Sequence, residues 1–193
     1  MKTSTLILPD SGIMPRKRWT REECRQLMTL GMLEQGKYEL IEGEIVVKMG
    51  QNGPHVFVCL QVFRLLVGIF GFDHVRFPAP VVIDETNEPE PDVAVTTGTT
   101  RDYIGDNPAS RDIRLAVEVS DSTIQSDKRI KATLYARAGI AEYWIVNINA
   151  RELIVHRAPT ENGYAEVEIR LEHETVQPLA APGTEIRVST FLP

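Results

Sequence analysis

The stretch "IRLAVEVSDST", residues 113–123, decides the fold, because its apolar run is typical of a buried strand and yet contains one acid. Glu118 lies near the middle of that run. Burying a carboxylate is costly unless a cation or hydrogen-bond donors compensate it. The stretch therefore predicts either a strand with one solvent-exposed face or a functional site in which the negative charge of Glu118 has a role.

Strand alternation assigns the polar groups of this region to faces. Ala116, Glu118 and Ser120 share one side of the predicted strand, opposite its apolar residues. In "PDVAV", residues 91–95, Asp92 shares a face with Ala94. Each carboxylate thus has a small neighbour that leaves room beside it. If the two strands are neighbours, Asp92 and Glu118 can converge on one hard cation through oxygen ligands.

The segment "STIQSDKRIKATLYARAG", residues 122–139, is predicted to form a capped helix that ends at Gly139. At ~100° per residue, Asp127 and Lys131 fall on its apolar face, with Leu134. Ile130 and Tyr135 flank them. An ammonium on that face needs a carboxylate, and Glu118 is its natural partner. Two interpretations stay open: a metal-assisted site for phosphodiester hydrolysis, or a buried Asp–Lys–Glu network with a purely structural role.

The rest of the chain predicts an α/β fold (mixed α+β) with a central mixed sheet flanked by helices. Apolar patterns predict helices over residues 20–31 and 54–71. A pair of strands is expected to turn at Glu42–Gly43, and a hairpin at Asn149–Ala150. Further strands are predicted for "APVVIDE" and "PDVAVTT", and outer strands for residues 164–171 and 184–192. We expect an N-terminal extension over residues 1–17 and one domain over residues 18–193.

Composition limits the classes of function. The chain has 193 residues, of which 42% are hydrophobic, and a net charge of -6 that argues against binding nucleic acid through a globally basic surface. No apolar run approaches the ~20 residues of a membrane span, and the apolar start at residues 6–8 is too short for a signal peptide. We therefore expect a cytoplasmic protein with no membrane partner. Cys24 and Cys59 show no metal-like spacing and are expected to be small core residues.

The order of three segments carries a family resemblance: "PEPDVAV", then "LAVEVSDST", then "SDKRIKATLYARAGIAEYWIVN". This order is similar to the PD-(D/E)XK nuclease superfamily, and more specifically resembles the large bacterial family of Uma-type restriction endonucleases. The upstream "KYELIEGEIVVK" and the histidine of "GPHVFVCL" also match that family's pattern. The resemblance covers roughly residues 18–192 and implies a restriction-endonuclease-like fold.

The resemblance also implies roles for particular residues. Asp92 and Glu118 would be the metal ligands, for Mg²⁺ or alternatively Mn²⁺. The superfamily's lysine normally stands two residues after that glutamate, and here Ser120 occupies the position. Members of the family usually carry this lysine on the next helix instead. Lys131 matches that position, with Asp127 beside it. Helical phase independently places Lys131 on the inner face of its helix, in agreement with this match.

Three further residues are candidate supporting groups. Glu39 in "YEL" matches an acid contributed early in the family's chain, which would ligate through water or orient a metal-bound water. His55 is expected to support the site or contact a phosphate, with a helix cap or a surface position as the alternative. Tyr135, one turn beyond Lys131, is expected to pack beside the site.

The leading hypothesis is a Mg²⁺-dependent endonuclease that hydrolyses DNA and works as a homodimer, because cutting both strands favours two-fold symmetry. The alternative is a non-catalytic nucleic-acid-binding or protein-interaction module that retains the nuclease fold. The missing lysine at position 120 and the acidic net charge favour that alternative. A two-carboxylate glycosidase fits poorly, because the inward Lys131 would have no role in it.

Overall fold

The computed structural model describes residues 16–48, 50–78, 80–121 and 124–193. Its centre is a six-stranded sheet in the order β3-β4-β5-β6-β7-β8. The pairing of β5 with β6 is parallel and every other pairing in this sheet is antiparallel. The strands are β3 (Val75–Arg76), β4 (Val93–Thr96), β5 (Ile113–Ser120), β6 (Glu142–Asn147), β7 (Glu152–Thr160) and β8 (Gly163–Leu171).

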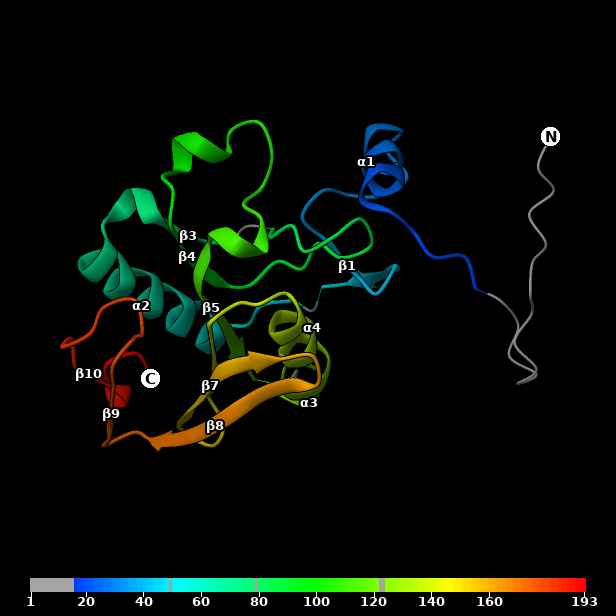
Figure 1. The fold of residues 1–193 in the computed structure, drawn as a ribbon. Helices are drawn as coiled ribbons and strands as arrows, with labels where there is room; N and C mark the ends of the chain where they lie inside the picture. Colours follow the sequence, from blue (N-terminus) through cyan, green and yellow to red (C-terminus); the bar gives the residue numbers. More distant parts are fainter. Residues whose placement is uncertain (1–15, 49, 79, 122–123) are drawn as a thin grey trace, which may run out of the picture.

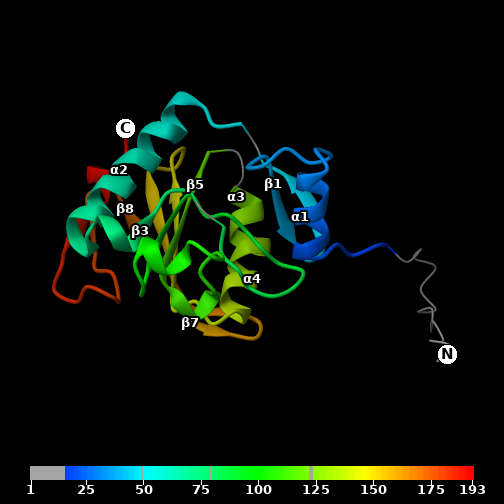
Figure 2. The same cartoon turned by 90° about the horizontal axis from the view of Figure 1, so that it is seen from above.

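Helices cover both faces of this sheet, as Figure 2 shows, with α2 (Gly53–Phe70) on one side and α4 (Ala132–Arg137) on the other. Each face has its own hydrophobic cluster. Val93 and Val117 pack on the α2 side, whereas Ala94 and Ala116 pack on the α4 side. The predicted alternation of β4 and β5 is therefore confirmed. The mixed α/β architecture and the central mixed sheet are confirmed with it.

The helix α2 begins after Asn52, whose side chain accepts a hydrogen bond from the His55 backbone N–H at 3.0 Å. Among the described residues, α2 alone has the length and composition of a membrane span, with 18 residues and a mean hydropathy of 1.7. Its Val58, Val62 and Leu66 are nevertheless buried against the sheet. One face of the helix thus packs on the sheet, whereas Val56, Phe57 and Leu60 are exposed. A cytoplasmic location stays a prediction.

The connection from β5 to β6 crosses the sheet through helical residues, as a parallel pair requires. The sequence predicts one continuous helix here, but the structure has α3 (Ile124–Ser126), a π-helical turn over Asp127–Lys131, and α4. The predicted burial of Asp127 and Lys131 is confirmed, whereas Ile130 is exposed. A π-turn spreads its residues differently from a regular helix, which explains the difference at Ile130. The predicted cap at residues 122–123 lies outside the described residues.

The N-terminal elements form a separate unit beside the sheet (Figure 1). The helix α1 (Arg21–Thr29) begins with a capping box between Thr20 and Glu23. The predicted strand pair is confirmed as β1 (Tyr38–Ile41) and β2 (Glu44–Val47), an antiparallel pair. Glu42 and Gly43 both have positive φ, as a tight two-residue hairpin turn requires.

Two strand predictions are wrong in extent. In its described part, residues 80–85, the segment "APVVIDE" makes isolated bridges only. Its Val81 and Val82 N–H groups donate to the carbonyls of Pro89 and Pro108, which do not belong to one neighbouring strand. Near the C-terminus, the predicted strand over residues 184–192 is reduced to β10 (Ile186–Arg187), which pairs with β9 (Thr175–Val176).

The sheet also contains a second buried glutamate, Glu142, whose side chain has no exposed surface. Its carboxylate accepts hydrogen bonds from the Trp144 indole N–H at 3.0 Å, from two Arg157 nitrogens, and from the Leu179 backbone N–H. Both oxygens of this acid are therefore satisfied by donors. The arrangement is that of a structural ion pair, which fixes β6 against β7.

Replacing Arg157 with methionine is expected to lower the free energy of unfolding by about 3 kcal/mol, because it leaves the Glu142 carboxylate buried without its cation. Urea denaturation measures the effect. The exposed pair of Arg151 and Glu172 provides the control, since Arg151→Met is expected to cost less than about 1 kcal/mol. Equal losses in the two variants would contradict a special role for the buried pair.

Candidate functional site

The two proposed metal ligands come from neighbouring strands. Val93 of β4 lies opposite Val117 of β5, so Asp92 stands at the end of β4 next to Glu118. One Asp92 oxygen accepts a hydrogen bond from the Val119 backbone N–H at 2.8 Å, which ties the residue to β5. Both carboxylates line the same cleft. The predicted adjacency of these strands is confirmed.

Lys131 reaches into this cleft from the π-turn. Its Nζ lies 2.8 Å from Glu118 Oε1 and 3.2 Å from the Glu39 carboxylate. The Tyr135 hydroxyl donates a third hydrogen bond to the system, to Glu118 Oε1 at 3.1 Å. The predicted contact between Glu118 and Lys131 is therefore confirmed. π-turns often occur at functional sites, and this one places the ammonium against β5.

Glu39 is brought to the site by the β1–β2 hairpin, although it lies 92 residues from Lys131 in the sequence. The strand β1 is held in place by Leu40, which exchanges backbone hydrogen bonds with Glu88 at 3.5 and 2.8 Å. On the other side of the cleft, the Ser120 hydroxyl donates to Asp127 Oδ2 at 2.9 Å. Position 120 thus faces the same group of side chains as Glu118.

His55 lies in the first turn of α2 and points at the acid cluster. Its Nε2 is 3.4 Å from Asp92 Oδ2, and its Nδ1 is 3.4 Å from the Cys59 thiol. Burial opposes protonation of this imidazole, but the attraction of Asp92 outweighs burial and raises the pKa of His55. The alternative of a simple surface histidine is wrong, because the side chain is only 15% exposed.

The cleft has a volume of about 470 Å³ and an excess of acid. Six carboxylates line it but only two lysines, Lys48 and Lys131. The acids are Glu39, Glu90, Asp92, Glu118, Asp121 and Asp127. So many acids in one partly enclosed space favour a cation there, since each raises the cost of ionising the next.

The pKa shifts follow from this crowding. Burial raises the pKa of Glu118 well above its ordinary value, and Lys131 offsets only part of the rise because Asp92 and Asp127 repel the charge. Burial likewise raises the pKa of Glu39 against the attraction of Lys131. For Lys131 itself, burial disfavours the charge, but Glu118 and Glu39 outweigh burial and raise the pKa. The lysine is therefore a charged hydrogen-bond donor at neutral pH.

Cys59 is a neighbour of the site that sequence reasoning assigned only to the core. The thiol is fully buried, as expected, yet it lies against His55 and within reach of Asp92. The spacing of four residues between His55 and Cys59 on one helix was the available signal. Gln51 is a second addition, with Nε2 3.5 Å from Asp92 Oδ1.

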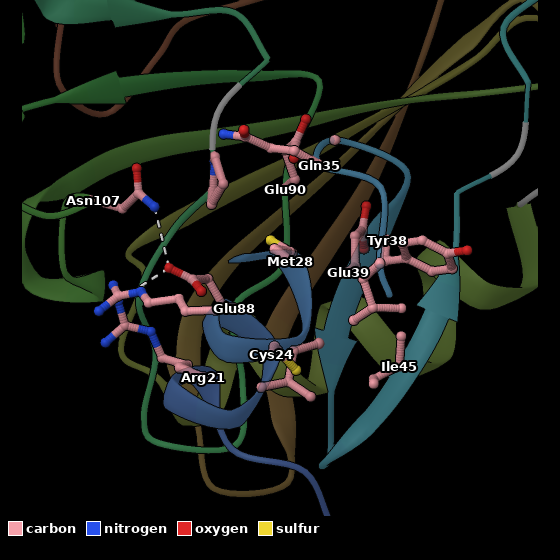
Figure 3. A pocket seen from close by; sticks show the side chains of 15 residues that line it. Arg21, Cys24, Met28, Gln35, Tyr38, Glu39, Ile45, Glu88, Glu90 and Asn107 are labelled. Atoms are coloured by element: carbon pink, nitrogen blue, oxygen red, sulfur yellow. Dashed lines mark hydrogen bonds and ion pairs between the residues drawn. The ribbon is translucent and has the colours of Figure 1, made fainter. Parts of the chain in front are cut away.

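A second cavity of about 260 Å³ lies on the far side of Glu39, between α1 and the β1–β2 hairpin (Figure 3). Glu39 and Glu90 line both cavities and so form part of the wall between them. At its polar end, Arg21 donates to Glu88 at 3.0 Å and Asn107 donates to the same oxygen at 3.1 Å. These bonds fix Glu88, whose backbone pairs with Leu40 next to Glu39.

A mixed sheet with helices on both faces, and with an aspartate, a glutamate and a lysine meeting at one end of its central strands, defines a restriction-endonuclease-like domain. A family model described as "Uma2: Putative restriction endonuclease" matches residues 21–189, and the chain belongs to this family. The fold is similar to a solved structure described as a "putative nuclease belonging to DUF820" from Anabaena variabilis. That similarity has a TM-score of 0.65 at 15% sequence identity and covers 89% of this chain and 96% of the other. The search of curated proteins returned no match.

Proposed function

We propose that the protein is a Mg²⁺-dependent endonuclease, also active with Mn²⁺, that hydrolyses phosphodiester bonds in DNA. The family supports a nuclease in general terms. The observation that carries the finer proposal is the contact of Lys131 with Glu118 at 2.8 Å, next to Asp92, in a cleft with excess acid. A DNA phosphate would be repelled by those acids unless a cation neutralised them.

The donor set fits a hard divalent cation. Asp92 and Glu118 offer carboxylate oxygens, which are the ligands that Mg²⁺ prefers, and Mg²⁺ commonly uses one or two carboxylates and fills its other positions with water and phosphate. A bound Mg²⁺ would polarise the phosphoryl oxygen and lower the pKa of a bound water. Asp92 is held rigidly by the Val119 N–H, and Glu118 by Tyr135 and Lys131.

Each side chain at the site has its own role in the proposed hydrolysis. Lys131 donates hydrogen bonds and stabilises the negative charge that develops when a water oxygen bonds to phosphorus and the bond to the leaving oxygen breaks. The water would lose its proton to solvent in the cleft, and the leaving oxygen would take one up from solvent. The Lys131 Nζ contacts the Glu118 and Glu39 carboxylates, which suits a hydrogen-bond donor. Glu39 fixes the lysine from the opposite side. Asp127, Ser120, Tyr135 and His55 support the groups that they contact, and two copies of the chain would cut the two strands as a homodimer.

The direct test is a cleavage assay on duplex DNA, single-stranded DNA and RNA, with Mg²⁺, Mn²⁺ or EDTA. Cleavage of DNA with either ion, and its loss in EDTA, is the expected result. Cleavage confined to RNA would contradict the DNA assignment, and cleavage that survives EDTA would contradict the metal dependence.

Metal binding also predicts a stability effect that does not require turnover. At a Mg²⁺ concentration a hundredfold above its Kd, the free energy of unfolding is expected to rise by about 2.7 kcal/mol. The corresponding Tm increase is roughly 5–10 °C. Thermal unfolding followed by circular dichroism measures it, with NaCl at equal ionic strength as the control. Glu118→Gln should unfold cooperatively and show no Mg²⁺-specific shift.

The second candidate function is a non-catalytic nucleic-acid-binding or protein-interaction module, favoured by Ser120 at the superfamily's lysine position. The two proposals differ in metal affinity. A folded protein that shows no thermal shift and no Mn²⁺ binding at millimolar concentration would support the non-catalytic module.

A further inference from the structure

We propose that His55, Cys59 and Asp92 form a second kind of metal site, which takes a divalent transition metal of the zinc class. The three residues offer one nitrogen, one sulfur and one oxygen donor, and these atoms lie within 4.8 Å of one another. Glu118 and Lys131 are not part of this set. The site shares Asp92 with the proposed Mg²⁺ site but extends from it toward α2.

The donor atoms are close enough for a tetrahedral ion to draw them together, since they lie within 4.8 Å of one another. His55 and Cys59 stand four residues apart on α2, so their side chains project from the same face. His55 Nδ1 lies 3.4 Å from Cys59 Sγ, and His55 Nε2 lies 3.4 Å from Asp92 Oδ2. Bonds of about 2.0–2.3 Å to a tetrahedral zinc place neighbouring donors roughly 3.3–3.8 Å apart. The two contacts involve different nitrogens of the His55 ring, and a single ion can bind only one of them. The ring must therefore reorient to bring one nitrogen between Cys59 and Asp92.

The donor atoms of the two proposed sites favour different metal ions. Mg²⁺ prefers oxygen, whereas a thiolate and an imidazole favour zinc, cobalt and related metals. Binding would release the Cys59 proton, because a metal-bound thiol is deprotonated. Three protein ligands leave a fourth position open, and here it would face the cleft, since His55 and Asp92 line that cavity. An ion can therefore enter from the cleft although Cys59 is fully buried.

Occupancy of this site would withdraw Asp92 from the Mg²⁺ site. This consequence rests on the proposed nuclease function: Zn²⁺ is then an inhibitor that acts by competition for one carboxylate. The binding itself is independent of catalysis, which allows the two ideas to fail separately.

Cobalt provides a probe that reports on the thiolate directly. Adding Co²⁺ to the full-length, reduced protein is expected to produce a thiolate-to-cobalt charge-transfer band that saturates near one equivalent and disappears on addition of Zn²⁺. Cys59→Ser should abolish the band. Cys24→Ser is the matched control, because Cys24 is the chain's other cysteine and lies in α1, and it should retain the band.

Two further variants complete the test. His55→Ala, at a side chain that reaches the cleft, should weaken Co²⁺ binding by at least about tenfold even if Cys59→Ser fails to fold. Glu118→Gln should keep the cobalt band but lose cleavage. A wild-type protein that shows the band but does not cleave DNA would contradict only the nuclease proposal. No band in the folded wild type, a band that persists in folded Cys59→Ser, or an undiminished Co²⁺ affinity in folded His55→Ala would overturn the zinc-class site.

Discussion

Replacing Asp92 with asparagine is expected to reduce Mg²⁺-dependent cleavage about a thousandfold while leaving the fold intact. Asparagine has the same shape and can still accept the hydrogen bond that the Val119 N–H donates at 2.8 Å. It loses the charge that would hold the cation beside Glu118. A loss of about 4 kcal/mol of transition-state stabilisation corresponds to a thousandfold in rate, which is the scale of metal-ion catalysis.

The measurement is single-turnover cleavage of duplex DNA, with circular dichroism to show that the variant is folded. Asp121→Asn is the matched control, because Asp121 lines the same cleft but is held by the Asn52 and Asn149 side chains and not by Val119. Asp121→Asn should remain within about threefold of wild type, a change below 1 kcal/mol. Wild-type rates in Asp92→Asn, or equal losses in both variants, would refute the assignment of Asp92.

Much of the site's layout could be predicted from local sequence, because strand alternation is a local property. The pattern around Val117 placed Glu118 on one face of β5, and the same rule placed Asp92 on the matching face of β4. Helical phase then placed Lys131 on the inner side of its segment. This last prediction succeeded although the segment contains a π-turn, since four residues separate Asp127 from Lys131 and both remain buried.

Contacts between residues far apart in the sequence could not be predicted from strand alternation or helical phase. Glu39 approaches Lys131 across 92 residues, and only the family resemblance indicated that it belongs to the site. The involvement of Cys59 depends on where α2 lies against β4, which alternation and phase do not specify. The predicted strand at "APVVIDE" is reduced to isolated bridges, because its hydrogen bonds go to scattered residues such as Pro89, Pro108 and Ser110 and not to one neighbouring strand. Strand formation is decided by the partner as much as by the segment.

The two buried glutamates of the sheet show why sequence alone left the structural and functional interpretations open. Glu118 and Glu142 both occur in apolar strand segments. Glu142 is surrounded by donors, from Trp144, Arg157 and a backbone N–H, and its charge is compensated. Glu118 has Lys131 and Tyr135 but also stands among other acids, and its pKa is raised by burial that those contacts do not offset. A buried acid that the fold leaves poorly compensated is the better candidate for function.

Replacing Lys131 with alanine is expected to lower the cleavage rate by about 10²–10³, the cost of removing one charged donor from a preorganised site. The sharper prediction is rescue: Ser120→Lys in the Lys131→Ala background should recover at least about tenfold of that loss. Position 120 shares the strand face of Glu118, and the Ser120 hydroxyl already reaches Asp127 at 2.9 Å. A lysine there would extend into the space that the shortened residue 131 vacates.

The control is Lys128→Ala, because Lys128 belongs to the same π-turn but is exposed to solvent. It should leave the rate at saturating DNA unchanged within about threefold. Undiminished cleavage by Lys131→Ala would show that the buried ammonium is structural, since burial and two carboxylate partners would then be its whole role. Rescue by a lysine at position 120 would show instead that the chemistry requires an ammonium at this point in space and does not depend on which element of the fold supplies it.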